Sequence, residues 1–331
     1  MATLKDVAKL ACVDVSTVSR ALNNTSYVHP DTKARIFAAV KELSYQPNVL
    51  AQGLRQGKRH TIGVIVPRLH MTVFAEVAQG IEQTARKNGY ATLICTTEED
   101  PQAEKECLNR FRNGFVDGII IAGTGGNGRL IRDIKASGIA VAQIIRRQER
   151  EISSVVADYE ACGYDAAKFL VSKGCKNIGL INGSMEISPY RGRYKGYKKA
   201  ITKYGLPEIT ISSSQQCNTF EYGYHCTRQL LENNPELDAI MTAVDVQGLG
   251  ALRALKESGK RVPEDVRVVS LTGHAVGSML ETSMTSLEVP ANEMGVKVTQ
   301  MIMEDIEAPQ DTKPSPQHLV FQSLLVERES T

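Results

Sequence analysis

The chain lacks the marks of a membrane-spanning, secreted or metal-binding protein. None of its apolar runs is long enough to cross a bilayer, and its first ten residues, MATLKDVAKL, contain no hydrophobic signal-peptide segment. Its seven cysteines include no C-x-x-C pair and show no metal-ligand spacing. These absences predict a cytoplasmic protein with reduced thiols, no bound metal and no membrane partner.

Signatures of common enzyme classes are missing as well. The six histidines have neither H-x-x-H nor H-E-x-x-H spacing, and the nucleophile motif G-x-S-x-G does not occur. GTGGNG at residues 123–128 does fit the dinucleotide motif G-x-G-x-x-G. However, it follows the third expected strand of its unit, and the next strand ends in Ile145-Arg146-Arg147, where a ribose-binding acid would be needed. A glycine-rich cleft loop is favoured, with a nucleotide-dependent enzyme as the alternative, and no cofactor is expected.

Charge is distributed unevenly along the 331 residues. Hydrophobic residues make up 42% and charged residues 23% of the chain, which is typical of a soluble globular protein with two or three domains. The net charge is +2. Residues 1–60 hold nine Lys/Arg against four Asp/Glu, a net charge of +5, so the remainder carries −3. A basic N-terminal segment on a mildly acidic body suggests that this segment meets a polyanion.

Two short helices and a third, longer one are predicted in the N-terminal segment. Thr3 followed by Asp6 is a capping-box start, and Asp14 is a good N-cap for a second helix that ends near Leu22. A third helix is expected over about residues 30–43. Apolar residues placed to pack between the first two helices are Val7, Ala8, Val13, Val18 and Leu22. This pattern predicts a helix-turn-helix.

The second helix of such a motif lies in the major groove of DNA. Ser16, Thr17 and Ser19 offer short groups that reach phosphates, while Arg20 is long enough for a bidentate contact to guanine. A three-helix bundle that binds protein is the alternative.

The same residues carry a family resemblance. The chain resembles the LacI/GalR family of transcriptional repressors over its whole length, and most specifically in the family pattern T-x-x-D-V-A-x-x-A-G-V-S-x-x-T-V-S-R-x-L-N, followed by Y-x-P-N-x-x-A-x-x-L. The matching residues are Thr3, Asp6, Val7, Ala8, Ala11, Val13, Thr17, Val18, Ser19, Arg20, Leu22 and Asn23, then Tyr45, Pro47, Asn48, Ala51 and Leu54.

The resemblance implies specific roles in DNA binding. Val15, Ser16 and Arg20 would be the main base readers. Asn48 would cap a short hinge helix that folds on the operator, and Leu54 would wedge into the minor groove and kink the duplex. The expected DNA-binding residues are Thr3, Val15, Ser16, Thr17, Ser19, Arg20, Asn23, Asn48, Ala51 and Leu54.

The predicted helix-turn-helix departs from the family at its turn. Cys12 stands where the family has Gly, and Asp14 replaces the usual Ser. If position 12 needs a positive φ, a cysteine there costs about 1 kcal/mol.

From Thr61 onward, buried β-branched runs alternate with amphipathic segments, in two consecutive sets. Examples are TIGVIVP, VDGIIIAG, KNIGLING and DAIMTAVD. This alternation predicts an α/β class with two doubly wound parallel-sheet subdomains and a ligand cleft between them, at the carboxyl ends of the strands. By the resemblance, this body is periplasmic-binding-protein-like. The expected domains are 1–46 for the helix-turn-helix head, 47–59 for the hinge helix and linker, and 60–331 for the core, with subdomains of roughly 60–160 plus 290–320 and 161–289 plus 321–331.

Polar residues just past the expected strands are candidates for ligand contacts. These residues are Arg68, His70, Asp158, Arg191, Asp245 and Thr272. The family's sugar ligands match Asp158, Arg191 and Arg146, where a carboxylate takes paired hydroxyls and an arginine bridges neighbours.

The cleft also departs from the family pattern. The usual Asn-Asp is Val244-Asp245, the usual G-[FY]-D is Ser270-Leu271-Thr272, and the usual acid after Pro67 is Arg68. Two polar sugar-binding groups are lost and a cation is gained. We therefore expect an anionic, phosphorylated sugar with Arg68 on its phosphate. The alternative places Arg68 at the cleft rim or in a dimer interface.

Taken together, the sequence predicts a DNA-binding transcriptional repressor of carbohydrate-utilisation genes, not an enzyme, released from its operator by a sugar or phosphorylated sugar. Control by a protein corepressor, as in the family's catabolite-control branch, is the alternative. The chain ends in LLVERES-T without a heptad tail, which favours a homodimer over a tetramer and hence a near-palindromic operator.

Overall fold

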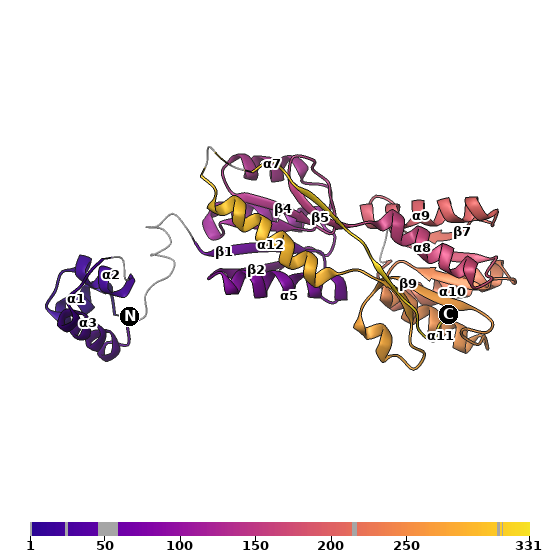
Figure 1. The fold of residues 1–331 in the computed structure, drawn as a ribbon, viewed down its shortest axis with the longest axis horizontal. Coiled ribbons are helices and arrows are strands. Elements are labelled where there is room, and N and C mark those ends of the chain that lie inside the picture. The colour runs from indigo at the N-terminus through magenta and orange to yellow at the C-terminus, as the bar shows by residue number, and fades with distance from the viewer. Residues whose placement is uncertain (1, 24–25, 46–58, 214–216, 310–311, 313) are drawn as a thin grey trace. The chain divides into compact units, whose positions relative to one another are not determined.

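The computed structural model describes residues 2–23, 26–45, 59–213, 217–309, 312 and 314–331 (Figure 1). The expected hinge residues Asn48, Ala51 and Leu54 lie outside this set. The chain divides into two compact units, Met1–Arg59 (the head) and His60–Thr331 (the core). Among the described residues, no helix combines the length and apolar character needed to cross a membrane.

The described residues of the head form three helices. They are α1 (Leu4–Ala11), α2 (Val15–Asn23) and α3 (Pro30–Glu42). The expected capping box is confirmed, because the Thr3 hydroxyl accepts from the Asp6 amide and the Asp6 side chain accepts from the Thr3 amide. The predicted packing residues also lie in one apolar cluster with residues of α3: Val7, Ala8, Val13, Val18 and Leu22 with Ile36 and Ala39.

The turn between α1 and α2 uses a left-handed residue. Cys12 has φ 53° and ψ 50°, the conformation for which glycine is favoured, so the expected positive φ is confirmed. At the start of α2, the backbone carbonyl of Asp14 accepts from the amides of Thr17 and Val18, at 2.9 and 3.1 Å. The cysteine therefore adopts a conformation that glycine would take without strain, at a small conformational cost.

The first subdomain of the core is a six-stranded sheet with helices on both faces. Its strands are β1 (Thr61–Val66), β2 (Ala91–Thr96), β3 (Gly118–Ile121), β4 (Ala140–Ile144), β5 (Ser153–Ala157) and β11 (His318–Phe321). Its helices are α5 (Thr72–Lys87), α6 (Pro101–Arg110), η1 (Phe111–Phe115), α7 (Gly128–Ala136) and α12 (Ala291–Glu307). Apolar clusters place α5 and α12 on one face and α6 and α7 on the other.

The second subdomain repeats this three-layer plan. Its strands are β6 (Ile178–Asn182), β7 (Ile209–Ser212), β8 (Ala239–Thr242), β9 (Arg267–Gly273), β10 (Thr285–Glu288) and β12 (Leu324–Val326). Its helices are α8 (Tyr159–Ser172), α9 (Ser188–Tyr204), α10 (Phe220–Asn233), α11 (Asp245–Glu257) and η2 (Ala275–Met279). Helices α8 and α9 cover one face, and α10 and α11 cover the other.

The strand orders are β11-β5-β4-β3-β1-β2 and β12-β10-β9-β8-β6-β7. The predicted doubly wound fold is confirmed with one exception: β12 pairs antiparallel with β10, whereas the other pairs are parallel. The chain passes between the sheets after β5, after β10 and after β11 (Figure 1). The closing segment of the sequence therefore supplies an edge strand to each sheet.

Glycines set the distance between α8 and α9. A Cβ on Gly163 would lie 2.1 Å from the carbonyl oxygen of Arg193, and one on Gly196 would lie 2.0 Å from that of Glu160. Both distances are too short for any side chain. This close approach brings Arg193, on α9, against Tyr159 at the start of α8.

Candidate DNA-reading helix and ligand chambers

The outward face of α2 holds the residues expected to read bases. Val15 is 38% exposed, and Ser16 and Arg20 are exposed, whereas Val18 and Ala21 are buried in the head. The helical period thus separates the packing residues from the exposed residues. Thr3 is exposed, and Thr17, Ser19 and Asn23 are partly exposed.

Polar side chains on this face bond within their own helix. Arg20 donates from Nε to the Ser16 carbonyl at 3.3 Å and from Nη2 to Thr17 Oγ1 at 3.2 Å. Asn23 donates to Ser19 Oγ at 3.3 Å. These contacts are long, and those of Arg20 are solvent-exposed, so a guanine or a phosphate can replace the Arg20 contacts at low cost.

Two adjoining cavities lie in the core at the carboxyl ends of the strands, where the sequence analysis expects a ligand. The first, here called the Arg193 chamber, is a partly open pocket with about 390 Å³ of empty space, some of it continuous with solvent. It is lined by Met71, Val73, Phe74, Ile145, Arg146, Tyr159, Ile187, Pro189, Tyr190, Arg193, Val244, Thr272 and Val289. The second, here called the Asp245 chamber, is also partly open and has about 390 Å³ of empty space. It is lined by His70, Met71, Thr72, Val73, Val244, Asp245, Val246, Thr272 and His274.

Arg193 is the buried cation of the first chamber. It is 3% exposed, and its guanidinium carbon lies 5.0 Å from the centre of the Tyr159 ring. Its Nε has no hydrogen-bond partner among the described residues. Burial raises the pKa of the Tyr159 hydroxyl to about 12, so this group stays protonated and donates to the Ile145 carbonyl at 2.8 Å.

Asp245 and His274 give the second chamber its polar groups. Ser270 Oγ donates to the Asp245 carboxylate at 2.7 Å, and burial raises the pKa of that carboxyl to about 6. His274 is 4% exposed, and its Nδ1 lies 3.0 Å from the Glu76 carboxylate. Glu76 belongs to α5 and His274 follows β9, so this contact joins the two subdomains across the cleft.

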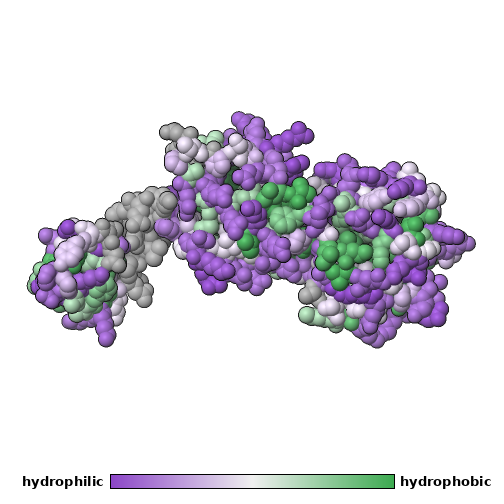
Figure 2. Space-filling model, in the orientation of Figure 1, coloured by the Kyte–Doolittle hydropathy of each residue, from purple (hydrophilic) through white to green (hydrophobic). Residues whose placement is uncertain are grey.

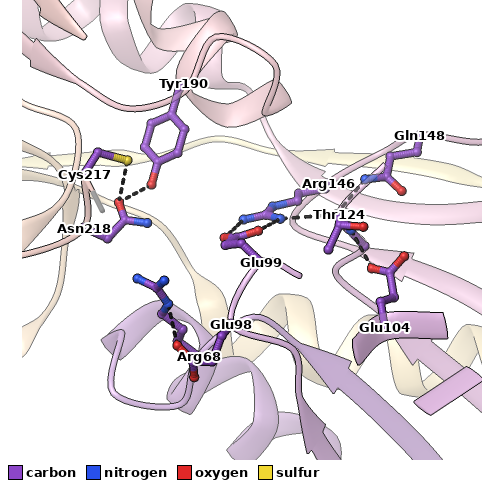
Figure 3. Close-up of polar contacts among 11 residues, drawn as sticks. Arg68, Glu98, Glu99, Glu104, Thr124, Arg146, Gln148, Tyr190, Cys217 and Asn218 are labelled. Carbon is purple, nitrogen blue, oxygen red and sulfur yellow. Dashed lines mark hydrogen bonds and ion pairs between the residues drawn. The ribbon is translucent and has the colours of Figure 1, made fainter. Parts of the chain in front are cut away.

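Two arginines of the first subdomain are matched by adjacent glutamates (Figure 3). Arg146 makes a bidentate contact to Glu99, with nitrogen–oxygen distances of 2.6 and 2.7 Å. Arg68 Nε lies 2.9 Å from a Glu98 carboxylate oxygen. Both glutamates have left-handed backbones, with φ 51° at Glu98 and 65° at Glu99. This loop after β2 thus turns two successive carboxylates toward two cleft arginines.

The glycine-rich loop at residues 123–128 is held by protein groups. Its Thr124 amide donates to the buried carboxylate of Glu104 at 2.5 Å (Figure 3). Asn127 donates to the other oxygen of Glu104 at 2.9 Å. The Gly123 carbonyl accepts from Arg146 and from Gln148. A carboxylate therefore occupies an amide that a nucleotide phosphate would need, which disfavours the dinucleotide interpretation.

Two of the residues expected at the ligand lie outside both chambers. Arg191 is exposed and donates to the backbone carbonyls of Met185 and Glu186, at 3.1 and 3.2 Å, outside both chambers. Asp158 is the N-cap of α8, where its carboxylate accepts from the Ala161 amide. It lines neither chamber.

The other expected ligand contacts divide between the chambers. Arg146 and Thr272 line the first, while His70, Asp245 and Thr272 line the second. Arg68 lines neither.

Arg193 is a buried chamber residue that the sequence analysis did not name. Its signal lies in the period of α9, whose buried residues Tyr190, Arg193 and Tyr197 recur at helical spacing. Arg191 falls on the opposite side of that helix. Helical phase therefore points to Arg193, whereas distance from the end of the strand points to Arg191.

The fold and the two sites define a class: a DNA-binding head joined to a two-subdomain core with internal chambers. The sequence model described as "Bacterial regulatory proteins, lacI family" matches residues 3–48. The model described as "Periplasmic binding proteins and sugar binding domain of LacI family" matches residues 59–323.

Known relatives and solved structures agree with these matches. The ribose operon repressor of Halalkalibacterium halodurans is 31% identical over 313 residues, which cover 94% of this chain and 93% of the relative. Catabolite control protein A of Priestia megaterium is 30% identical, with 91% of each chain covered. The structure of a transcriptional regulator CelR–cellobiose complex has a TM-score of 0.74 at 27% identity and covers all of both chains. The Lac repressor bound to ONPG has a TM-score of 0.87 at 25% identity, with coverage of 100% and 99%.

The chain therefore belongs to the lacI family of bacterial regulatory proteins. It is a DNA-binding transcriptional regulator and not an enzyme.

Proposed function

We propose that this protein represses carbohydrate-utilisation genes in the cytoplasm, and that a small molecule in the core chambers releases it from its operator. The DNA-binding part of this proposal rests on the outward face of α2, where Val15, Ser16 and Arg20 are exposed. The opposite side of the helix is buried against the rest of the head. Thr3, Thr17, Ser19 and Asn23 would supply further contacts, together with Asn48, Ala51 and Leu54 outside the described residues.

The location and lining of the two chambers support a small-molecule effector. Residues from both subdomains line them, so a ligand would favour one relative setting of the subdomains over another. The family's sugar-binding domain and the relatives' names, among them a ribose operon repressor, point to a sugar or phosphorylated sugar. Arg146, Asp245, Thr272 and His70 would be contacts, with Arg193 in place of Arg191.

A homodimer on a near-palindromic operator completes the proposal. Figure 2 shows hydrophobic patches on the visible, otherwise mostly hydrophilic face of the core. Leu93 and Ile94, on the edge strand β2, are 43% and 41% exposed. Apolar side chains on an unpaired sheet edge favour burial against another copy. Arg68, near this strand's end, could serve either the cleft rim or that interface.

Selection of bound sites from random DNA by the full chain tests the function. We expect a palindromic consensus, and weaker binding to it by R20A by about 1–3 kcal/mol with relaxed preference at one base pair per half-site. R35A, on the exposed face of α3, is the matched control and should keep the same consensus. If the full chain shows no preference over random fragments at moderate salt, the proposal is wrong.

A protein corepressor is the second candidate, favoured by the similarity to catabolite control protein A. Operator binding measured with sugars and, separately, with a phosphocarrier protein separates the two. A response to the phosphocarrier protein alone would favour the corepressor.

A further inference from the structure

The two arginines of the Arg193 chamber differ in whether their charge is matched. The Arg146 guanidinium binds both carboxylate oxygens of Glu99 and also donates to the Gly123 carbonyl at 3.2 Å. Arg193 forms no ion pair among the described residues. Its neighbours are the Tyr159 ring and the Cys162 thiol, whose pKa is raised by burial, so neither is an anion.

A buried guanidinium without a counter-charge is costly, because desolvation is not repaid by a nearby anion. Asp245, in the adjoining chamber, interacts with it electrostatically: the charge of Arg193 lowers the Asp245 pKa. That carboxyl is itself 8% exposed and accepts a hydrogen bond from Ser270, and no ion pair joins it to Arg193 in the described part of the chain. The arginine therefore invites an anionic group from a ligand.

Every hydroxyl in the chamber lining already donates to the protein. Tyr159 donates to the Ile145 carbonyl at 2.8 Å, Thr272 donates to the Ala243 carbonyl at 2.8 Å, and Tyr190 donates to Asn218 (Figure 3). These hydroxyls can still accept, but arginine side chains cannot. A polyhydroxylated ligand would have few side-chain acceptors for its own protons, and each unsatisfied buried hydroxyl costs about 1–3 kcal/mol.

The remainder of the lining is apolar. Met71, Val73, Phe74, Ile145, Val244 and Val289 surround the cation without offering side-chain hydrogen bonds. Val244 stands where the family pattern has a polar residue, so this chain has replaced a sugar-binding group with a hydrocarbon. Such a surface favours a ligand body with exposed C–H groups.

We propose that the Arg193 chamber takes a small monocarboxylate with an apolar body, whose carboxylate pairs with the Arg193 guanidinium. The planar guanidinium matches a carboxylate in a bidentate geometry, and the Tyr159 ring holds it in place from one face. This inference rests on the proposed function, because it takes the chamber as the effector site. It keeps the effector site of the proposed function but replaces the sugar with a carboxylate, and it moves the anion contact from Arg68 to Arg193.

Calorimetric titration of the full chain tests this proposal with a matched set of probes. They are benzoate and cyclohexanecarboxylate as carboxylates, benzamide as the neutral counterpart of benzoate, and ribose and ribose 5-phosphate as the sugars. We expect each carboxylate to bind about tenfold or more tightly than benzamide, and more tightly than either sugar. R193Q should abolish the preference for benzoate over benzamide. R193K keeps the positive charge but not the bidentate guanidinium, so it should retain part of this preference.

R191Q is the control, because Arg191 lies two residues away on the same helix but outside both chambers. It should bind all probes as the unmodified chain does, and circular dichroism of all three variants checks that they fold. Tighter binding of either sugar, equal binding of benzoate and benzamide, or no carboxylate binding at millimolar concentration would overturn the inference. Operator binding without ligand, measured in parallel, keeps the two proposals apart: if it persists while the carboxylates fail, only this inference is wrong.

Discussion

In the first subdomain, Arg146 and Arg68 each contact a glutamate of the loop after β2, whereas in the second subdomain Arg193 contacts no carboxylate among the described residues. The two buried arginines are nearly equal in exposure, at 4% for Arg146 and 3% for Arg193. What differs is the compensation of their charge. Removing one partner of a matched buried pair is destabilising, whereas an unmatched charge is retained at a cost to stability and indicates a binding role.

The backbone of the glutamate loop supports this distinction. Two successive non-glycine residues with positive φ cost about 1–2 kcal/mol each, so the surroundings must hold them there. The bidentate contact of Glu99 to Arg146 is a strong, geometrically specific interaction that can offset this cost. In the first subdomain, a strained backbone therefore places a carboxylate against the buried Arg146. No such carboxylate is placed against Arg193 among the described residues of the second subdomain.

E99A should have the largest effect, because it leaves the Arg146 charge buried without its partner. We expect the free energy of unfolding to fall by about 3–5 kcal/mol in urea denaturation of the full chain. Relief of the left-handed backbone does not oppose this loss, since alanine is no better suited than glutamate to positive φ. A loss below about 1 kcal/mol would mean that Glu99 does not compensate Arg146, and the contrast between the subdomains would disappear.

In the second subdomain, the buried carboxyl of Asp245 should make the free energy of unfolding depend on pH. Its pKa is raised by burial to about 6, above the ordinary value of 3.8, so folding disfavours the charged carboxylate. Wild-type stability contributed by this group is present below pH 4 and is lost as the pH rises through about 6. The free energy of unfolding of D245N relative to wild type should therefore rise across this window by up to about 3 kcal/mol and then level off.

The control for this measurement is E281Q, at a side chain that is 85% exposed. It should change the unfolding free energy by less than about 1 kcal/mol across the same range. In an R193M background the rise seen with D245N should extend to higher pH, because Arg193 lowers the Asp245 pKa. An unchanged window would show that Arg193 and Asp245 do not interact.

The sequence predicts the fold well because its signals are local. The capping box at Thr3, the left-handed turn at Cys12 and the alternation of buried strands with amphipathic helices all follow from residues within a few positions of each other. The site residues are less predictable. Sequence position near a strand end suggested Arg191 and Asp158, but neither lines a chamber: Arg191 lies on the exposed side of α9, and Asp158 caps α8.

The charge pattern of the cleft depends on contacts between distant residues. Glu99 reaches Arg146 across 47 positions, and Glu104 reaches Thr124 across 20. No periodicity or motif encodes these pairs, and the backbone of Glu98 and Glu99 is one that glutamate rarely adopts. Whether an arginine is available to a ligand therefore follows only from the folded structure.

Replacing the unmatched arginine should have the opposite sign to replacing the matched one. R193M removes an uncompensated buried charge, so we expect the free energy of unfolding to rise by about 1 kcal/mol, reduced by the lost contact with the Tyr159 ring. R146M should lower it, because Glu99 loses its partner. Urea denaturation of both variants measures the difference. Equal destabilisation of the two would mean that Arg193 is compensated within the protein.

The smallest effect is expected at Glu98, the neighbour of Glu99 in sequence and in backbone conformation. The Arg68–Glu98 pair joins atoms 2.9 Å apart, but the Glu98 side chain is 63% exposed, against 22% for Glu99. Solvent screens such a pair, so E98A should lower the free energy of unfolding by less than about 1 kcal/mol, and less again at high salt. Because E98A and E99A make the same change one position apart at similar φ, their difference isolates burial of the partner arginine from backbone effects. A loss at E98A equal to that at E99A would show that the strained loop, and not the buried charge, governs stability there.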